Sequence, residues 1–246
     1  MKARTLTIEE RLQISKEYKE GKTAPELSKK HRCSMNQVYD IAKKYGGRYK
    51  LNEEVSISDK QHQILLGGFL GDGRFRVNGS ENVYYSECHA LGEVDYLNWK
   101  HTMLGDLTKD SKIYDKNANN DHGKAKEFTS KTTPSLIKYM SYTKIEAIRE
   151  LDELGLLIHL LDDGWLRVNS KTSGNFAITT YTWSEDERTQ LINQWKKVVG
   201  VNFKESGIKR VNISVGKDDS GIIYELAKKH IPMNLDICKK KFRVFT

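Results

Sequence analysis

Cysteine and long apolar runs are both scarce in this chain of 246 residues. The three cysteines, Cys33, Cys88 and Cys238, are odd in number, far apart and without a CxxC pair, which argues against a disulfide framework or a zinc site. The polar start of the chain lacks the apolar core of a signal peptide, and no apolar run is long enough to span a bilayer. These absences predict a cytoplasmic protein in a bacterial, phage or organellar-matrix setting, with no signal peptide.

Two common ligand motifs are also missing. The glycines at positions 68, 71 and 73 do not have the spacing that dinucleotide-binding loops require. The acidic stretch that begins at Asp115 lacks the central glycine of a calcium loop and has Lys126 where such a loop needs glutamate. Neither stretch therefore predicts a nucleotide or calcium site.

Negative charge is in deficit, because the chain has 41 Lys and Arg but only 33 Asp and Glu, which gives a formal net charge of +8. Such an excess favours a polyanionic partner, since lysines and arginines that neutralise phosphates release the counterions condensed on nucleic acid. A soluble protein that is merely basic is the alternative at this point.

An apolar run that ends in Asp-Gly occurs twice, at 65–73 and at 156–164. After the acids Asp72 and Asp163 the pattern Asp-Gly-x-apolar-Arg-Val-Asn recurs in register, and a Trp-Lys pair follows in both copies, at 99–100 and 195–196. The chain therefore contains a duplication with a period of 91 residues (163 minus 72). A single Asp-Gly after a helix would favour a plain turn, whereas its recurrence inside a duplicated unit favours a function for both acids.

Each copy predicts the same order of elements. Ser58 and Asp152 are helix caps, and the helices that they open run through the apolar motifs to the acids. Residues 74–78 and 165–169 then alternate polar and apolar side chains, which predicts strands with one solvent-exposed face. Three glycines in the first motif helix reduce its stability, so we expect a second backbone to pack closely against them. Each copy is thus predicted to be an α+β unit.

The N-terminal part, residues 1–46, predicts three short helices with caps at Thr7, Thr23 and Ser34, followed by a linker at 47–57. The stretch from Lys22 to Tyr39 resembles the helix-turn-helix of resolvases and transposases, which implies DNA binding. A three-helix bundle used for protein contacts is the alternative. The side chains that this resemblance would present to a major groove are Met35, Asn36, Gln37, Tyr39, Asp40 and Lys43.

The two motifs and their acids resemble those of the two-motif, single-chain LAGLIDADG homing endonucleases, over about residues 58–242. The resemblance implies two pseudo-twofold-related αββαββα repeats, at 58–142 and 143–246, that form a saddle on DNA. It also implies a monomeric, site-specific endonuclease of intron homing that cuts both strands of a long double-stranded DNA target. An RNA splicing maturase acting on intron RNA, or a non-cleaving DNA-binding regulator on the same fold, is the alternative.

The same resemblance implies a metal site. Asp72 and Asp163 would hold two or three Mg²⁺ ions, with Mn²⁺ as a substitute, helped by the backbone carbonyls of Gly71 and Asp162. Hydrolysis of a phosphodiester needs an activated water and neutralised phosphate charge, which hard cations held by carboxylates supply. Lys144 and Lys239 fall nearest the positions of the family's assisting lysines. The side chain of Asp162 is expected to lie in a turn, and His159 is expected to be packed.

The solvent-exposed faces of the predicted sheets are the candidate DNA-reading surface. Arginine reads guanine and asparagine reads adenine, which selects Arg74, Arg76, Asn78, Arg167 and Asn169. Lysines suit phosphates, which selects Lys112, Lys116, Lys126, Lys204 and Lys209.

Overall fold

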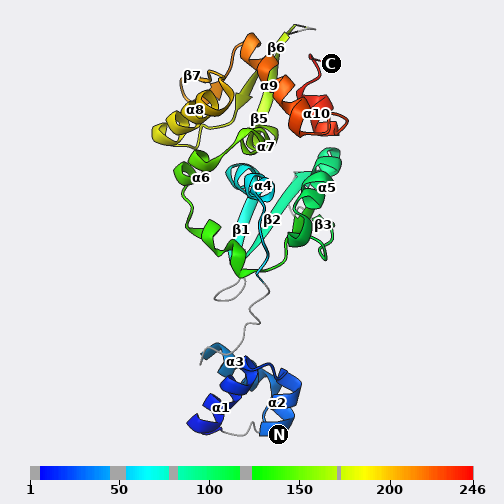
Figure 1. Cartoon of the computed structure of the whole chain (residues 1–246), viewed down its shortest axis with the longest axis vertical. Coiled ribbons are helices and arrows are strands. Elements are labelled where there is room, and N and C mark those ends of the chain that lie inside the picture. The colour runs from blue at the N-terminus through cyan, green and yellow to red at the C-terminus, as the bar shows by residue number, and fades with distance from the viewer. Residues whose placement is uncertain (1–5, 45–53, 78–82, 117–123, 171–172, 246) are drawn as a thin grey trace.

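A computed structural model describes residues 6–44, 54–77, 83–116, 124–170 and 173–245 (Figure 1). Its N-terminal part has three helices, α1 (Ile8–Lys19), α2 (Ala24–His31) and α3 (Met35–Lys44). Thr7 and Thr23 cap the first two through capping boxes, as the sequence predicts. These helices enclose a small core of their own, formed by Leu6, Ile14, Ala24, Leu27, Val38 and Ile41.

The first α+β repeat follows. Its four-stranded sheet is antiparallel and has the strand order β1-β2-β4-β3. Its main elements are α4 (Asp59–Leu70), β1 (Gly73–Val77), β2 (Val83–Ala90), α5 (Val94–Met103), β3 (Tyr114–Lys116) and β4 (Ala125–Thr129). Short 3₁₀ helices lie at η1 (Leu91–Glu93), η2 (Gly105–Leu107) and η3 (Pro134–Ser141).

The second repeat has the same arrangement, with the strand order β5-β6-β8-β7. A short helix, α6 (Lys144–Glu150), leads into it from the first repeat. Its elements are α7 (Glu153–Asp163), β5 (Gly164–Ser170), β6 (Ser173–Ile178), α8 (Glu185–Val199), β7 (Lys204–Ser206), β8 (Asn212–Ser214), α9 (Lys217–His230) and α10 (Asp236–Lys241). The matching strand orders show that the duplication seen in the sequence is a duplication of structure.

The helices α4 and α7 carry the two motifs and pack side by side between the sheets (Figure 1). A Cβ atom at Gly67 would collide with the backbone carbonyl of Gly155 and with the side chain of Ile158. The predicted close approach of a second backbone is therefore confirmed at Gly67, where glycine in one helix makes room for isoleucine in the other. At Gly68 and Gly71 the neighbours are side chains instead, namely Tyr85 and Asp162.

A polar clamp joins the two repeats at the end of this helix pair where α7 begins, away from the acids. The side-chain amide of Gln63, on α4, donates to the carbonyl of Glu150 at 2.8 Å. Its oxygen accepts from the backbone N–H of Asp152, also at 2.8 Å, just where α7 begins. Gln63 is buried, so both bonds lie out of water and hold the start of α7 against α4.

One apolar core extends through both repeats. The recurring Trp-Lys pair does not occupy equivalent environments in it: Trp99 is half-buried and Lys100 fully buried, whereas Trp195 is fully buried and Lys196 exposed. Val77 and Val168 also differ from the expected pattern, because they are 55% and 42% exposed although the alternation assigns them to the apolar face. Both lie toward the ends of their strands away from the acids.

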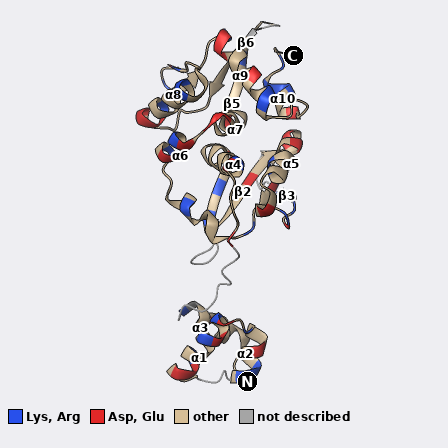
Figure 2. Ribbon diagram, viewed as in Figure 1, with Lys and Arg blue, Asp and Glu red and all other residues tan. Residues whose placement is uncertain are grey.

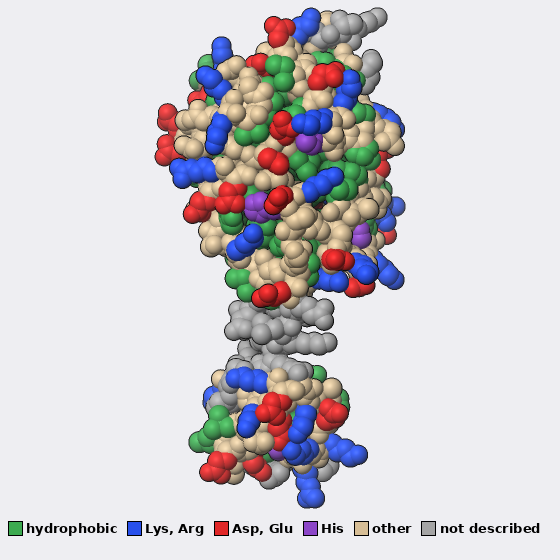
Figure 3. Space-filling model, in the orientation of Figure 1, with side chains coloured by type: hydrophobic (Ala, Val, Ile, Leu, Met, Phe, Trp, Pro, Cys, Tyr) green, Lys and Arg blue, Asp and Glu red, His purple; other side chains and the backbone are tan. Residues whose placement is uncertain are grey.

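Basic side chains are spread over several elements. Figure 2 shows Lys and Arg on β1 and α10, among other places. On the face presented in Figure 3 they alternate with Asp and Glu and do not gather in one patch. Among the described residues, no helix has both the length and the apolar character needed to cross a membrane.

Candidate functional site

The two acids of the motifs stand at corresponding places in the fold. Asp72 follows α4 and precedes β1, and Asp163 ends α7 and precedes β5. Their side chains are 40% and 33% exposed. Burial, together with the negative charge of Asp72, raises the pKa of Asp163 to about 6. The duplicated turn from helix to strand therefore places both carboxylates at one end of the paired helices, where the charge of Asp72 acts on Asp163.

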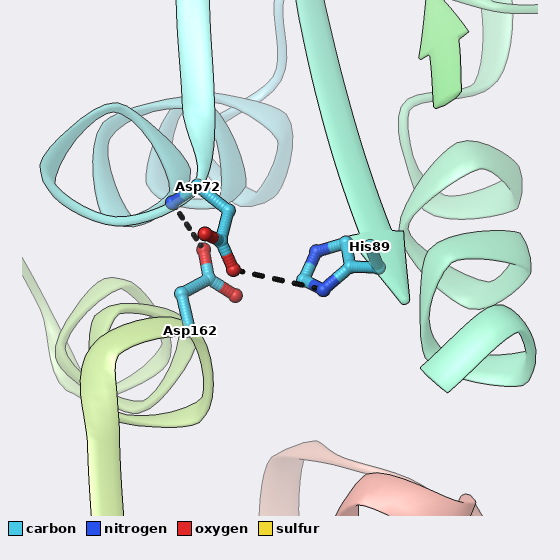
Figure 4. A group of neighbouring side chains, drawn as sticks. All are labelled: Asp72, His89 and Asp162. Carbon is cyan, nitrogen blue, oxygen red and sulfur yellow. Dashed lines mark hydrogen bonds and ion pairs between the residues drawn. The ribbon is translucent and has the colours of Figure 1, made fainter. Parts of the chain in front are cut away.

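Asp162 differs from the sequence prediction. It belongs to the last helical turn of α7 and not to the connection that follows the helix, and its side chain is fully buried. Its carboxylate accepts two hydrogen bonds from Lys100 Nζ, at 2.7 and 2.9 Å, and one from the Tyr96 hydroxyl at 3.0 Å. The backbone N–H of Asp72 approaches it at 3.5 Å (Figure 4). Burial raises the pKa of Asp162 above its usual range, against the opposing charge of Lys100.

Lys100 also contacts Glu87, a fully buried carboxylate on β2. His89 Nε2 lies 2.7 Å from the same Glu87 oxygen, and the Tyr85 hydroxyl donates to the other oxygen at 2.6 Å. Burial disfavours the charged form of Glu87, but the charges and hydrogen bonds of Lys100 and His89 together outweigh burial and lower the pKa of Glu87 to about 2. The sequence did not predict this cluster, because Lys100 and Asp162 lie 62 positions apart in the chain and meet only in the fold.

His89 faces three carboxylates. Its Nδ1 lies 3.4 Å from Glu93 Oε2 and 3.6 Å from Asp72 Oδ2. Burial disfavours the imidazolium, but the hydrogen bonds with Glu87 and Glu93 outweigh it and raise the pKa of His89 to about 10. At neutral pH His89 is therefore a cation beside Asp72.

Asp72, His89 and Asp162 each offer a ligand atom within 4.8 Å of the others (Figure 4). Protonated His89 has no free lone pair for a metal, and both oxygens of Asp162 already accept from Lys100. Asp72 and Asp163 are partly exposed carboxylates, which suit a hard divalent cation. The residues present thus fit a cation held by oxygen, and the carbonyls of Gly71 and Asp162 stay predicted helpers.

The predicted lysines lie in different surroundings. Lys144 Nζ lies over the ring of Trp183, 4.6 Å from its centroid, and its positive charge favours the Asp163 carboxylate. Lys239 is 62% exposed and pairs with Asp236 at 2.8 Å on its own helix. The member of the lysine triple that reaches the end of α7 is Lys241.

Lys241 is buried, and its ammonium donates to the carbonyls of Leu161 and, at 2.7 Å, of Gly164. These carbonyls lie at the C-terminal end of α7, where the helix dipole favours a cation. One signal in the sequence could have identified it: Lys241 follows Ile237 and Cys238 by four and three residues, which places it on the buried face of α10.

His159 is packed, as predicted. It is fully buried and stacks on Trp183 with ring centroids 5.2 Å apart. Burial lowers its pKa to about 3, so it is neutral at physiological pH. Its Nε2 lies 3.9 Å from Asp163 Oδ2.

The candidate DNA-reading side chains of the sheets are mostly exposed. Asn169 donates to the side-chain oxygen of Asn175 at 2.8 Å, Lys116 pairs with Glu127 at 3.0 Å, and half-buried Lys126 pairs with Asp115 at 2.8 Å. Asn78 lies outside the described residues. The exposed members are Arg74, Arg76, Lys112, Lys116, Arg167, Asn169, Lys204 and Lys209.

On α3, Met35 and Tyr39 are 48% and 51% exposed, and Asn36 and Asp40 are exposed as well. Gln37 is half-buried and accepts from the backbone N–H of Ser34 at 3.0 Å, so it serves the start of the helix. The side chain of Lys43 is outside the described residues. Five of the residues predicted to face the groove have described side chains, and all of them except Gln37 are exposed. Three of these exposed side chains are polar or aromatic: Asn36, Tyr39 and Asp40.

The sequence pattern of the LAGLIDADG DNA endonuclease family matches residues 62–221, which is more than half of the chain. The chain belongs to this family. Its fold is also that of the homing endonuclease I-WcaI bound to its DNA recognition sequence, with a TM-score of 0.63 at 15% identity, over 82% of this chain and 91% of that one. The predicted α+β fold of two LAGLIDADG repeats is confirmed.

Two curated proteins are also similar to this LAGLIDADG chain. RecA of Mycolicibacterium flavescens is 29% identical over 183 residues, which cover 66% of this chain and 42% of that protein. RecA of Mycolicibacterium fallax is 22% identical over 210 residues, 78% of this chain and 49% of that protein. The chain spans less than half the length of these relatives.

Proposed function

We propose that this protein is a site-specific DNA endonuclease that hydrolyses one phosphodiester bond in each strand of a long double-stranded target. The observation that carries the proposal is the pair of partly exposed acids, Asp72 and Asp163, at the same end of two packed motif helices. Membership of a DNA endonuclease family supports DNA as the substrate. One acid per repeat suits one cut per strand.

The metal-binding residues in this proposal are the carboxylates of Asp72 and Asp163, with the backbone carbonyls of Gly71 and Asp162. Two or three Mg²⁺ ions, or Mn²⁺ in their place, would activate water and neutralise phosphate charge. The chain itself supplies the fixed position of the acids and nearby positive charge. Lys144 favours the ionised form of Asp163, and Lys241 holds the end of α7 from which Asp163 projects.

The sheets provide the proposed binding surface for a major groove, with arginines and Asn169 reading bases and lysines contacting phosphates. Lys116 and Lys126 would have to exchange an acidic partner for a phosphate, so they contribute less than the exposed Lys204 and Lys209. The three-helix N-terminal unit extends the DNA footprint through α3. The protein acts as a monomer, because both acids belong to one chain, and it leaves short 3′ extensions.

Amide substitution of each acid tests the proposal. Asp72→Asn and Asp163→Asn should each abolish cleavage of a selected target in Mg²⁺, because a neutral amide holds a divalent cation poorly. DNA affinity measured in Ca²⁺ should stay within about threefold of wild type, since the acids hold metal and do not read bases. Asp106→Asn, at an exposed position, is the matched control. Cutting by both acid variants at the wild-type rate would refute the assignment.

A further inference from the structure

The buried cluster of acids and a lysine beneath Asp72 has no counterpart among the described residues of the second repeat, where the buried lysine, Lys241, binds carbonyls. Glu87 lies opposite Gly73 in the register of β1 and β2, and Ile178 lies opposite Gly164 in the register of β5 and β6. In the recurring Trp-Lys pair, Lys100 of α5 is fully buried, whereas Lys196 of α8 is exposed. The second repeat thus has an apolar side chain where the first has Glu87, and the lysine of its pair faces solvent.

Removing charges from water is unfavourable, and a buried ion pair often stabilises a protein less than apolar residues of similar volume would. The side chains of Glu87, Lys100 and Asp162 are all fully buried. Stability alone therefore does not explain this cluster, which points to a role for what its bonds hold in place.

Those bonds connect the two repeats. Asp162 belongs to the second repeat, but its carboxylate is bound by Lys100 and Tyr96 of the first and approached by the backbone N–H of Asp72. Gly71 has no side chain at the point where Asp162 crosses, and a Cβ there would collide with it. The Asp162 carboxylate is therefore locked into the first repeat next to the first acid.

Both ends of the α4 and α7 pair are fixed by polar contacts between repeats. The Gln63 clamp holds the start of α7, and the Lys100–Asp162 pair holds its end. Asp163 is the next residue after Asp162, and Asp72 is the next after Gly71. A shift of one helix along the other would break both contacts and would change the separation of the two acids.

We propose that Lys100 and Asp162 form a positioning pair that sets the separation between Asp72 and Asp163. Neither side chain touches the substrate or the metal; both act through the backbone that carries the acids. The inference rests on the proposed function, because the acids must be placed for two metal-dependent cuts. It adds to that function a reason for the asymmetry between the repeats.

The decisive variant is Lys100→Met combined with Asp162→Leu, which keeps the net charge and replaces the ion pair by apolar side chains. Buried Glu87 loses Lys100 in this variant but keeps its hydrogen bonds with His89 and Tyr85. We expect a melting temperature at or above that of wild type, unchanged DNA affinity in Ca²⁺, and a loss of cleavage rate of about 100-fold, the scale that follows a misplacement near 1 Å. Lys100→Met alone should also lose cleavage, with a lowered melting temperature, because it leaves a buried carboxylate unpaired. Lys228→Met, which breaks the exposed pair with Glu225, is the control and should cut normally.

A cleavage rate that recovers in the double variant together with the melting temperature would overturn the inference, because the pair would then be only structural. Wild-type cleavage by Lys100→Met would overturn it as well. A kcat that falls while DNA affinity holds supports it.

A protein that is not an endonuclease can be distinguished from a wrong assignment of the positioning pair. If wild type cuts no DNA, Mn²⁺ binding by electron paramagnetic resonance still tests the positioning role, since the double variant leaves the net charge unchanged. We then expect Mn²⁺ to bind the double variant about tenfold more weakly than wild type, in line with the loss of other residues that orient metal ligands. Equal Mn²⁺ affinity, or no Mn²⁺ binding by wild type, overturns the inference.

Discussion

Each motif acid has a histidine beside it, and the two histidines differ in charge. His89, 3.6 Å from Asp72, is hydrogen-bonded to acids and has a pKa of about 10. His159, 3.9 Å from Asp163, is stacked on Trp183 in apolar surroundings, and burial lowers its pKa to about 3. Asp72 therefore has a cation next to it at neutral pH and Asp163 has a neutral ring, so the two acids of the duplicated motif are chemically inequivalent.

The burial of Asp163 predicts how metal binding depends on pH. The pKa of Asp163 is raised from 3.8 to about 6, so its carboxylate becomes protonated as the pH falls through that value and no longer serves as a ligand. Mn²⁺ affinity, measured from about pH 8 down to about pH 5, should fall by about tenfold per unit below the pKa. Asp163→Asn should bind Mn²⁺ weakly and without this dependence. A wild-type profile that stays flat across the range would contradict the assignment of Asp163 as a ligand.

Glu17 predicts a separate pH effect in the N-terminal unit. Its buried carboxylate accepts from Lys30 at 2.6 Å, and also from Gln13 and Lys22, and these bonds hold the pKa of Glu17 well below its ordinary 4.5. The stabilisation is fully present above 4.5 and is lost as the pH falls through the lower folded-state pKa.

Glu17→Gln should therefore lower the free energy of unfolding of this unit by about 2 kcal/mol at neutral pH, the typical scale for hydrogen bonds to a charged group. Hydrogen exchange of the amides in α1, α2 and α3 reports this in the full chain. Exposed Glu9→Gln is the matched control. Equal protection in wild type and Glu17→Gln would show that the network does not stabilise the unit.

At the scale of elements, the α4 and α7 pair depends on the glycine at its crossing. Gly67→Ala should destabilise the protein by about 1–3 kcal/mol, because the new methyl group would collide with the Gly155 carbonyl and with Ile158. Gly221→Ala is the matched helical control, since a Cβ there meets nothing within 4 Å, and it should stabilise the protein by about 1 kcal/mol. Chemical denaturation compares the two. Similar effects of both changes would mean that the helices do not approach as described.

The elements that the sequence predicted well are those with local signals. The capping box at Ser58 and the side-chain cap at Asp152 mark where α4 and α7 begin, and these signals involve residues only three positions apart. The repeat itself also revealed the paired acids, because a second copy of Asp-Gly separates a functional pattern from a plain turn.

The parts that the sequence did not predict depend on contacts between distant residues. Asp162 meets Lys100 across 62 positions, and Lys241 meets the carbonyl of Leu161 across 80. Which buried group a lysine of a helix meets is decided by what packs against that helix, and no local pattern encodes that partner. Helical spacing from Ile237 and Cys238 does indicate that Lys241 faces inward, whereas the sequence prediction named Lys239.

At the scale of the whole molecule, the proposed DNA footprint has two parts: the sheets and α3. Replacing Asn36 and Tyr39 together by alanine should shorten the protected DNA at one end and weaken binding, because these exposed side chains are the proposed groove contacts. The positions of the two cuts should not change, since they are set by the acids. Footprinting of the cleavage target in Ca²⁺ measures both. An unaltered footprint would favour the other role considered for this unit, contact with a protein.

The measurement that tests the central claim most directly is cleavage of a randomised duplex library by the purified chain in Mg²⁺. EDTA and the double variant Asp72→Asn, Asp163→Asn serve as controls. We expect one long sequence to be recovered from cut ends with wild type in Mg²⁺, and no cut ends with either control. Enrichment of DNA by binding alone, without cut ends from wild type, would contradict the endonuclease assignment and favour a non-cleaving regulator, and neither cutting nor enrichment would direct attention to structured intron RNA.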